Sequence, residues 1–206
     1  TEREGYDFTG WYLDAALTQP ITSLTLEADT TVYAGWRIRN PFVDVAEKDY
    51  FYDAVLWGVE NGVVKGMDET HFEPETVCTR AQALTFLWRA NGSPKATGAS
   101  PFTDVQAGSY YYDAVLWAVE KGITEGTSAT TFSPGASCTR AQMVAFLYRA
   151  AGSPAPKSTV NPFTDVSAND YYYNAVLWAV ENGITTGVSA DRFAPGATVS
   201  RAQTVT

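Results

Sequence analysis

The feature that most constrains this 206-residue chain is a block that occurs three times. The copies begin at Pro41, Pro101 and Pro162, so they are spaced by 60 and 61 residues. Each copy opens with Pro-Phe-x-Asp-Val and continues through an aromatic-led apolar segment to a glycine and a Phe-x-Pro loop. Thr/Ser-Arg-Ala-Gln then leads into a second apolar run. Repeats of this size bury their apolar faces against one another, so the pattern predicts one cooperative three-lobed module.

Each copy is expected to form a helix, a loop and a second helix. The first helix ends at a glycine, in the position of a left-handed C-cap residue. Apolar side chains cover most of its circumference, so it needs partners on several sides. Its tryptophan shares a polar-leaning face with two acidic side chains, as in Asp53, Trp57 and Glu60. This pattern predicts that the tryptophans stand at a rim.

The second helix has a capping box as its start signal. The hydroxyl group of the first motif residue accepts from the backbone N–H three positions on, and the glutamine side chain reaches back to the first N–H. The pairs are Thr79 with Gln82, Thr139 with Gln142, and Ser200 with Gln203. We interpret these residues as structural or supporting.

Capping does not require the arginine that fills the first helical position in every copy, as Arg80, Arg140 and Arg201. A cation there faces the positive end of the helix dipole, which costs roughly 0.3–1 kcal/mol. A bound anion would offset this cost, because free N–H groups and a guanidinium both favour a carboxylate or phosphate. The three arginines are therefore the first candidates for ligand binding.

Two further sets of residues recur in all three copies. The tryptophans of the first helix are secondary ligand-binding candidates because aromatic faces stack on sugars, with core packing as the alternative. The aspartates of Pro-Phe-x-Asp-Val are expected to make a local turn or helix cap, with pairing to the motif arginine as the alternative. The residues are Trp57, Trp117, Trp178, Asp44, Asp104 and Asp165.

Composition argues against several classes of function. The net charge of -9 opposes non-specific binding to nucleic acid or to an anionic membrane. No apolar run approaches the length of about 18 residues that a membrane span needs. One histidine, His71, and two cysteines, Cys78 and Cys138, leave little material for a catalytic triad or a zinc site. We therefore expect no enzymatic activity, no metal and no cofactor.

The rare residue types carry expectations of their own. His71 has no counterpart in the other copies and is expected in an exposed loop. Cys78 and Cys138 occupy the position that Val199 fills in the third copy, which indicates small buried side chains. We expect both cysteines to be free thiols, because a threefold arrangement would hold them too far apart for a disulfide.

The order of these segments resembles the S-layer homology (SLH) domain of bacterial surface proteins, usually present in three tandem copies. The resemblance covers roughly residues 40–206. It implies a helical, three-pronged pseudo-trimer that binds a peptidoglycan-linked secondary cell-wall polysaccharide, commonly one carrying pyruvate ketals. The family motif is Thr-Arg-Ala-Glu, and its arginine is tied to ligand binding, which implies this role for Arg80, Arg140 and Arg201. Here glutamine replaces that glutamate three times, so a negative charge is removed beside the expected anion site.

The first 36 residues differ from the repeats. Residues 8–12 and 28–36 carry aromatic and β-branched residues around turn formers, which predicts a short β-hairpin. They resemble part of a small β-grasp repeat of internalin-type surface proteins, and we expect both chain ends to be cut from something larger. The predicted units are residues 1–36, 37–94, 95–154 and 155–206, the last being a truncated repeat.

Together these observations predict a mainly α-helical, secreted binding module that anchors a larger protein to the cell wall. The expected ligand is an anionic polysaccharide bound in grooves between repeats, and the alternative is a protein–protein assembly scaffold of a surface layer. The excess of acidic side chains lies in residues 1–94. We therefore expect the second and third copies to provide the better anion grooves, and substitution of Arg80 not to be the most damaging.

Overall fold

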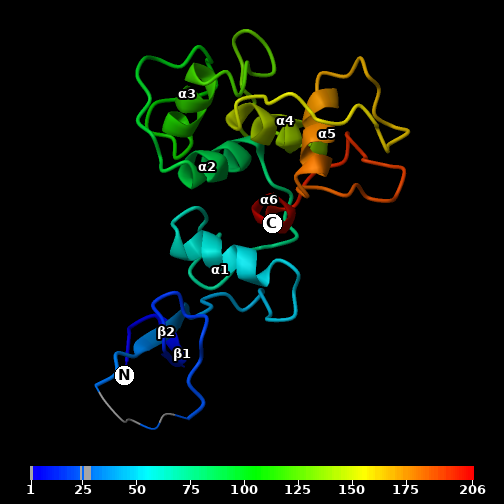
Figure 1. Ribbon diagram of the computed structural model, residues 1–206. Coiled ribbons are helices and arrows are strands. Elements are labelled where there is room, and N and C mark those ends of the chain that lie inside the picture. The colour runs from blue at the N-terminus through cyan, green and yellow to red at the C-terminus, as the bar shows by residue number, and fades with distance from the viewer. Residues whose placement is uncertain (1, 24, 26–28) are drawn as a thin grey trace.

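The computed structural model describes residues 2–23, 25 and 29–206, in which six helices and two strands form. They are β1 (Tyr6–Tyr12), β2 (Tyr33–Ile38), α1 (Tyr52–Glu60), α2 (Arg80–Ala90), α3 (Tyr112–Glu120), α4 (Arg140–Ala150), α5 (Tyr173–Glu181) and α6 (Arg201–Val205). Figure 1 shows the helices around a common centre, with the two strands beside α1. The mainly helical fold with a small N-terminal sheet is confirmed.

The helices begin and end where local signals predict. At the start of α2, Thr79 Oγ1 accepts from the Gln82 N–H at 3.2 Å, and Gln82 Oε1 accepts from the Thr79 N–H at 2.9 Å. The same reciprocal pair starts α4 and α6. The glycines that follow α1, α3 and α5 have φ angles of 68°, 67° and 68°, in the left-handed region that ends a helix. The predicted capping boxes and glycine stops are confirmed.

The prongs of the module are shared between copies. α2 of the first copy packs against α3 of the second, and α4 of the second packs against α5 of the third. Figure 1 shows these two pairs in the upper half of the molecule. α6 of the third copy packs against α1 of the first. Every prong therefore joins two copies, and the third copy closes the arrangement onto the first.

Three backbone hydrogen bonds form a ring at the centre of the module. The N–H of Cys138 donates to the carbonyl of Cys78 (2.9 Å), that of Cys78 to Val199 (2.9 Å), and that of Val199 to Cys138 (3.0 Å). The three residues hold equivalent positions in the three copies, so the ring is the pseudo-threefold centre. Both cysteines are free and buried, as predicted. The expectation that they lie too far apart for a disulfide was wrong, because the two cysteines are hydrogen-bonded neighbours.

An aspartate near the start of each copy holds the Phe-x-Pro loop of that copy. The carboxylate of Asp104 accepts from the N–H groups of Phe132 (2.8 Å) and Ser133 (2.7 Å). Asp44 and Asp165 bind the equivalent N–H groups in their copies. These bonds are of a structural kind, but the partners lie 28 and 29 residues away, so the expected local turn or cap is wrong. No ion pair joins these aspartates to a motif arginine within the described ranges.

The loop that each aspartate holds contains a residue in an unfavourable backbone conformation. The residue between phenylalanine and proline has φ angles of 58°, 59° and 57° in the three copies, although none of the three is glycine. A non-glycine residue adopts this left-handed conformation at a cost, and only where its surroundings hold it. The phenylalanine beside it is fully buried in each copy, as Phe72, Phe132 and Phe193. The loop is thus fixed by a buried ring on one side and by two hydrogen bonds on the other.

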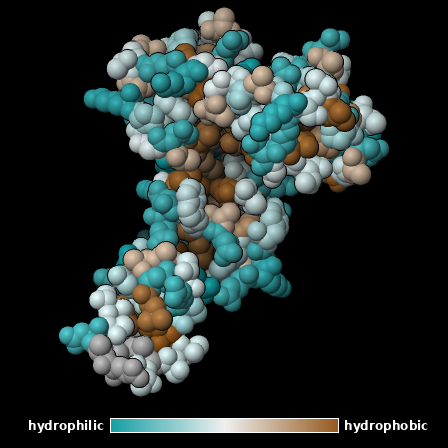
Figure 2. Space-filling model, in the orientation of Figure 1, coloured by the Kyte–Doolittle hydropathy of each residue, from teal (hydrophilic) through white to brown (hydrophobic). Residues whose placement is uncertain are grey.

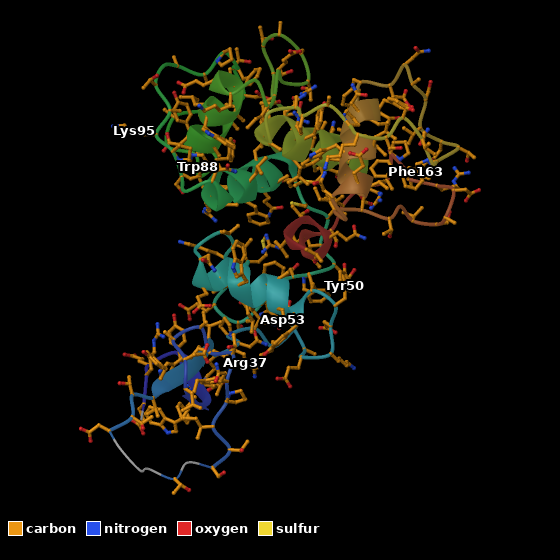
Figure 3. All side chains as sticks on the ribbon, viewed as in Figure 1. Arg37, Tyr50, Asp53, Trp88, Lys95 and Phe163 are labelled. Carbon is orange, nitrogen blue, oxygen red and sulfur yellow. The ribbon has the colours of Figure 1, made fainter. Side chains whose placement is uncertain are left out.

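The N-terminal sheet docks on the first copy. β1 and β2 pair antiparallel, as the hairpin prediction requires. Arg37 of β2 forms a 3.0 Å ion pair with Glu47, and Ile38 packs against the helical core. Figure 3 shows Arg37 at the junction between the sheet and α1. Residue 28, where the second predicted hairpin segment begins, lies outside the described residues. The docking matters because an isolated two-stranded sheet is only marginally stable in water.

Candidate functional site: the grooves between copies

Each motif arginine reaches from its own copy into the next one. The Nε of Arg80 donates to the carbonyl of Phe132 at 3.0 Å, across 52 residues of sequence. Arg140 and Arg201 donate in the same way to Phe193 (2.7 Å) and Phe72 (2.8 Å). This hydrogen bond offsets part of the energetic cost of placing a cation at the start of a helix. The arginine is therefore explained in part by the fold, which the sequence argument for a bound anion had not considered.

Aromatic rings support the guanidinium groups. The Cζ of Arg80 lies 4.7 Å from the ring centre of Phe132 and 5.5 Å from that of Phe146. Arg201 has the equivalent pair of rings, and Arg140 has one ring, that of Phe193. Such contacts attract a cation to the ring face. Burial lowers the pKa of Arg80, because the charged form loses hydration. A buried guanidinium group of this kind is stabilised by any further hydrogen-bond acceptor or anion.

The three arginines differ in what their outer nitrogen contacts. The Nη2 of Arg201 donates to the carbonyl of Lys65 at 2.9 Å, and that of Arg140 to Thr185 Oγ1 at 3.3 Å. The Nη2 of Arg80 is buried and has no hydrogen-bond partner among the residues that the structure describes. Arg80 is only 3% exposed, so this nitrogen is not generally hydrated. A buried polar group without a partner costs about 1–3 kcal/mol, more when charged.

A cavity of about 420 Å³ lies against Arg80. Its lining comes from three copies: Arg80 from the first, Gly126, Gln142 and Arg149 from the second, and Tyr171 from the third. Tyr171 is 64% exposed and stands at the outer side. A side chain at Gly126 would collide with the Phe102 ring at 2.5 Å, so this turn needs glycine. Sequence reasoning missed Arg149, although an arginine recurs there as Arg89.

The groove beside Arg140 is smaller and more apolar. Its cavity measures about 80 Å³ and is lined mainly by Met143, Val144, Leu147 and Ile184. Gln203 also borders it. Because Arg140 Nη2 is already bonded, this groove offers less unsatisfied donor capacity than the one beside Arg80.

The three tryptophans do not occupy equivalent surroundings. Trp57 is 56% exposed, Trp117 is 5% exposed, and Trp178 is partly buried against Tyr148 with ring centres 5.7 Å apart. The predicted rim position is therefore wrong for Trp117, which belongs to the core. Figure 2 shows apolar surface between α1 and the upper prongs, and a cavity of about 120 Å³ borders Trp57 there.

His71 lies in an exposed loop, as predicted. Its Nδ1 is 3.1 Å from Asp68 Oδ2. Hydrogen bonds from the Thr70 N–H and from His71 lower the pKa of Asp68 to about 2. Within the described part of the chain, no group of three or more His, Cys, Asp or Glu residues is placed to hold a metal ion. Nor is any helix described there long and apolar enough to cross a membrane.

The structure is a repeat module in which three helical copies form a ring, with cavities beside Arg80 and Arg140. The S-layer homology domain model matches residues 41–84, 101–144 and 162–205. The chain therefore belongs to the S-layer homology domain family. The Listeria-Bacteroides repeat domain matches residues 1–35, in agreement with the predicted surface repeat. Membership places the protein outside the cell, at the cell surface or cell wall, with a general role in cell-wall anchoring.

Individual relatives share only this part of their sequence. The chain is 34% identical to the surface-layer 125 kDa protein of Lysinibacillus sphaericus, over 69% of this chain and 12% of that protein. It is 32% identical to an S-layer protein of Bacillus thuringiensis subsp. finitimus, over 79% and 20%. It is 38% identical to an endoglucanase of Bacillus sp. strain KSM-635, over 55% and 12%. The chain thus spans a fifth or less of the length of these relatives.

Proposed function

We propose that this chain anchors its protein by binding an anionic secondary cell-wall polysaccharide in the grooves between copies, with the Arg80 groove as the main site. A sugar that carries a carboxylate, such as a pyruvate ketal, is the proposed binding unit. The chain itself is proposed to be non-catalytic. The observation that carries the proposal is made at Arg80: its buried Nη2 lacks a partner within the described residues, and the residue lines a cavity.

The chemistry of the groove supports an acidic sugar. A cavity of about 420 Å³ falls in the usual size range of small-ligand sites. Arg80 and Arg149 both line it, and a guanidinium binds a carboxylate with short, charge-assisted hydrogen bonds. Tyr171 adds a ring and a hydroxyl at the exposed side, where sugar C–H faces and hydroxyl groups would lie. The groove thus offers donors for an acid and an aromatic surface for a sugar ring.

This proposal changes the expected ranking of the copies. From net charge alone, the second and third copies were expected to hold the better grooves. The groove now favoured takes most of its lining from the second copy but its motif arginine from the first. Among the motif arginines we therefore rank Arg80 first as a ligand-binding residue, because each groove lies between copies and does not belong to one copy.

The test compares Arg80→Lys with Arg201→Lys in the full chain. Both changes remove an Nε bond to a phenylalanine carbonyl, so both should lower the free energy of unfolding by about 1–3 kcal/mol. Only Arg80→Lys also removes the free Nη2. We expect its retention on purified wall sacculi to fall about tenfold or more, since lysine cannot bind a carboxylate bidentately. Retention of Arg201→Lys should fall much less.

Stripped sacculi provide the second arm. Removal of the non-peptidoglycan polymer should abolish retention of the native chain. Unchanged retention there would contradict the polysaccharide proposal and favour peptidoglycan itself or a protein receptor. Equal losses for the two arginine variants on intact sacculi would contradict the special role of Arg80.

A further inference from the structure

We infer that the Arg80 groove is one part of a longer binding track, and that a second cavity, which shares Arg149 with it, binds a further acidic sugar of the same polymer. This second cavity measures about 410 Å³. The inference rests on the proposed function and extends the ligand from one acidic sugar to an oligosaccharide that carries at least two carboxylates.

The two cavities lie next to each other along the same two segments. In the loop after α3, Ile123 lines the second cavity, and the next residue, Thr124, lines the cavity at Arg80. On the other wall, Arg149 of α4 lines both cavities, and Ala150 continues along the second one. Because both walls pass directly from one cavity to the other, one chain molecule can occupy both.

The charged residues of this track are mostly cations. Lys121 and Arg149 are the charged residues that line the second cavity, and neither forms an ion pair with any residue that the structure describes. The first cavity adds Arg80 and one acid, Glu125. Three cations thus face one acid here, although the whole chain has 14 basic and 23 acidic residues. This local excess favours a ligand with more than one negative charge.

A tryptophan adds a neutral donor to the second cavity. Trp117 lines this cavity and is only 5% exposed. Its Nε1 donates no hydrogen bond within the described residues. In that part of the chain, the one buried side-chain nitrogen or oxygen without a partner is Arg80 Nη2, so the Trp117 N–H is open to solvent. The second cavity therefore has an indole donor beside two cations, a combination that suits a carboxylate or a sugar hydroxyl group.

The lysine is particular to the second copy. The equivalent residues, Asn61 and Asn182, donate their side-chain amides to the carbonyls of Trp57 and Trp178 at 2.8 Å. Lys121 cannot be held by that neutral amide bond and instead brings a charge to the end of α3. A cation there also stabilises the helix dipole, which is the alternative explanation. Asparagine at this position is the residue of the two other copies, so Lys121→Asn is expected to fold.

The experiment uses Lys121→Asn in the full chain and two synthetic probes. The one-acid probe is a methyl hexoside with one pyruvate ketal, and the two-acid probe is a methyl tetrasaccharide with such ketals on two of its sugars. Dissociation constants are measured by calorimetry at pH 7. We expect the variant to lose about three- to tenfold in affinity for the two-acid probe, because Lys121 is exposed and its charge is partly screened. Its affinity for the one-acid probe should stay the same.

Lys48→Asn is the matched control. Lys48 is an exposed residue of the first copy and lines neither cavity, so its loss removes the same charge and should leave both affinities unchanged. Urea unfolding of Lys121→Asn tests the alternative. If the lysine served only the helix dipole, the unfolding midpoint would fall while both affinities stayed the same.

Nuclear magnetic resonance provides a direct measure of occupancy. The indole N–H signal of Trp117, assigned by its loss in Trp117→Phe, should shift when the native chain is saturated with the two-acid probe. The same addition to Lys121→Asn, at a concentration that saturates only the native chain, should give a smaller shift.

Three results would overturn the inference. They are equal weakening of both probes by Lys121→Asn, unchanged binding of the two-acid probe by this variant, and a native preference for the two-acid probe of no more than about twofold, which two equivalent acids competing for one site would give. The proposed function fails separately, if the native chain does not bind the one-acid probe and Arg80→Lys keeps its retention on sacculi. Binding of the one-acid probe that depends on Arg80, together with a native-like Lys121→Asn, would refute the second cavity alone.

Discussion

At the scale of single residues, one peptide group connects the fold to the groove. The N–H of Phe132 is bound by Asp104, and its carbonyl is bound by the Nε of Arg80. The aspartate and the phenylalanine belong to the second copy, whereas the arginine belongs to the first. A change in either charged side chain should therefore shift the loop that both hold.

The clamp made by Asp104 should depend on pH. Burial would raise the pKa of Asp104, but hydrogen bonds from Phe132 and Ser133 outweigh it and keep the pKa below its ordinary value. The carboxylate therefore stabilises the fold above the unfolded-state pKa of about 4, and this stability is lost as pH falls through the lower folded-state pKa. Asp104→Asn should lower the free energy of unfolding by about 1–3 kcal/mol at pH 7 and by less at pH 3. Urea unfolding curves at both pH values measure the difference.

Asp113→Asn is the matched control for this prediction. Asp113 lies in the first turn of α3, in the same copy, and is exposed. Its substitution should change the free energy of unfolding by no more than about 0.5 kcal/mol. A loss in Asp104→Asn that is as large at pH 3 as at pH 7 would assign the effect to packing and not to the carboxylate.

At the scale of elements, helices in equivalent positions of the copies differ in burial. α3 packs against α2, and α1 packs against α6. Trp117 of α3 and Trp57 of α1 have the same place in their copies but are 5% and 56% exposed. Identical residues in a repeat thus acquire different energetic roles.

The two tryptophans should differ in their contribution to stability. Trp117→Ala removes a large core side chain and should lower the free energy of unfolding by about 3–5 kcal/mol. Trp57→Ala removes a mostly exposed ring and should cost less than about 1 kcal/mol. Denaturant unfolding followed by circular dichroism compares them. Equal losses would contradict the difference in burial between the two rings.

Local sequence signals predicted the elements well. A capping box spans only four residues, and a glycine stop acts within one turn, so both could be identified from nearby positions. The pairing of helices between copies could not be predicted, because it joins segments that no local rule connects. The neighbouring positions of Cys78 and Cys138 were missed for the same reason: the central ring depends on how all three copies meet.

The site was predicted only in part. The recurrence of Arg80, Arg140 and Arg201 pointed to the candidate grooves, and cavities lie beside Arg80 and Arg140, but recurrence made the three arginines look equal. Their differences come from single neighbours on distant loops, the carbonyl of Lys65 in one case and the hydroxyl of Thr185 in another. Such contacts depend on backbone positions to within an ångström, and these are not readable from a repeat pattern.

At the scale of the whole molecule, the central ring makes folding of the copies interdependent. Each bond of the ring joins two copies, and each prong contains helices from two copies. Opening one copy therefore breaks contacts in both others. The module is expected to unfold in one cooperative transition.

The buried thiols can test this cooperativity. Burial raises the pKa of Cys138 to about 12 and shifts the pKa of Cys78 in the same direction, so both thiols react slowly in the folded chain. In denaturant they should react with a disulfide reagent in one phase, at the rate of unfolding measured by tryptophan fluorescence. Val199→Cys places a third thiol at the third position of the central ring, and this thiol should react in the same phase as the other two. One thiol reacting well ahead of the others would mean that the copies open separately.

The closed triangle of backbone bonds also limits the copy number of the module. Each residue of the ring donates one N–H and accepts one at its carbonyl oxygen. A residue of a fourth copy can therefore enter only if an existing hydrogen bond breaks. A four-cornered ring would push its opposite corners apart and leave an unfilled space, which a close-packed interior does not tolerate cheaply. A single extra copy gained by gene duplication would lie outside the ring, with its apolar helices exposed to solvent. The unit that duplication can multiply without such exposure is therefore the complete triplet.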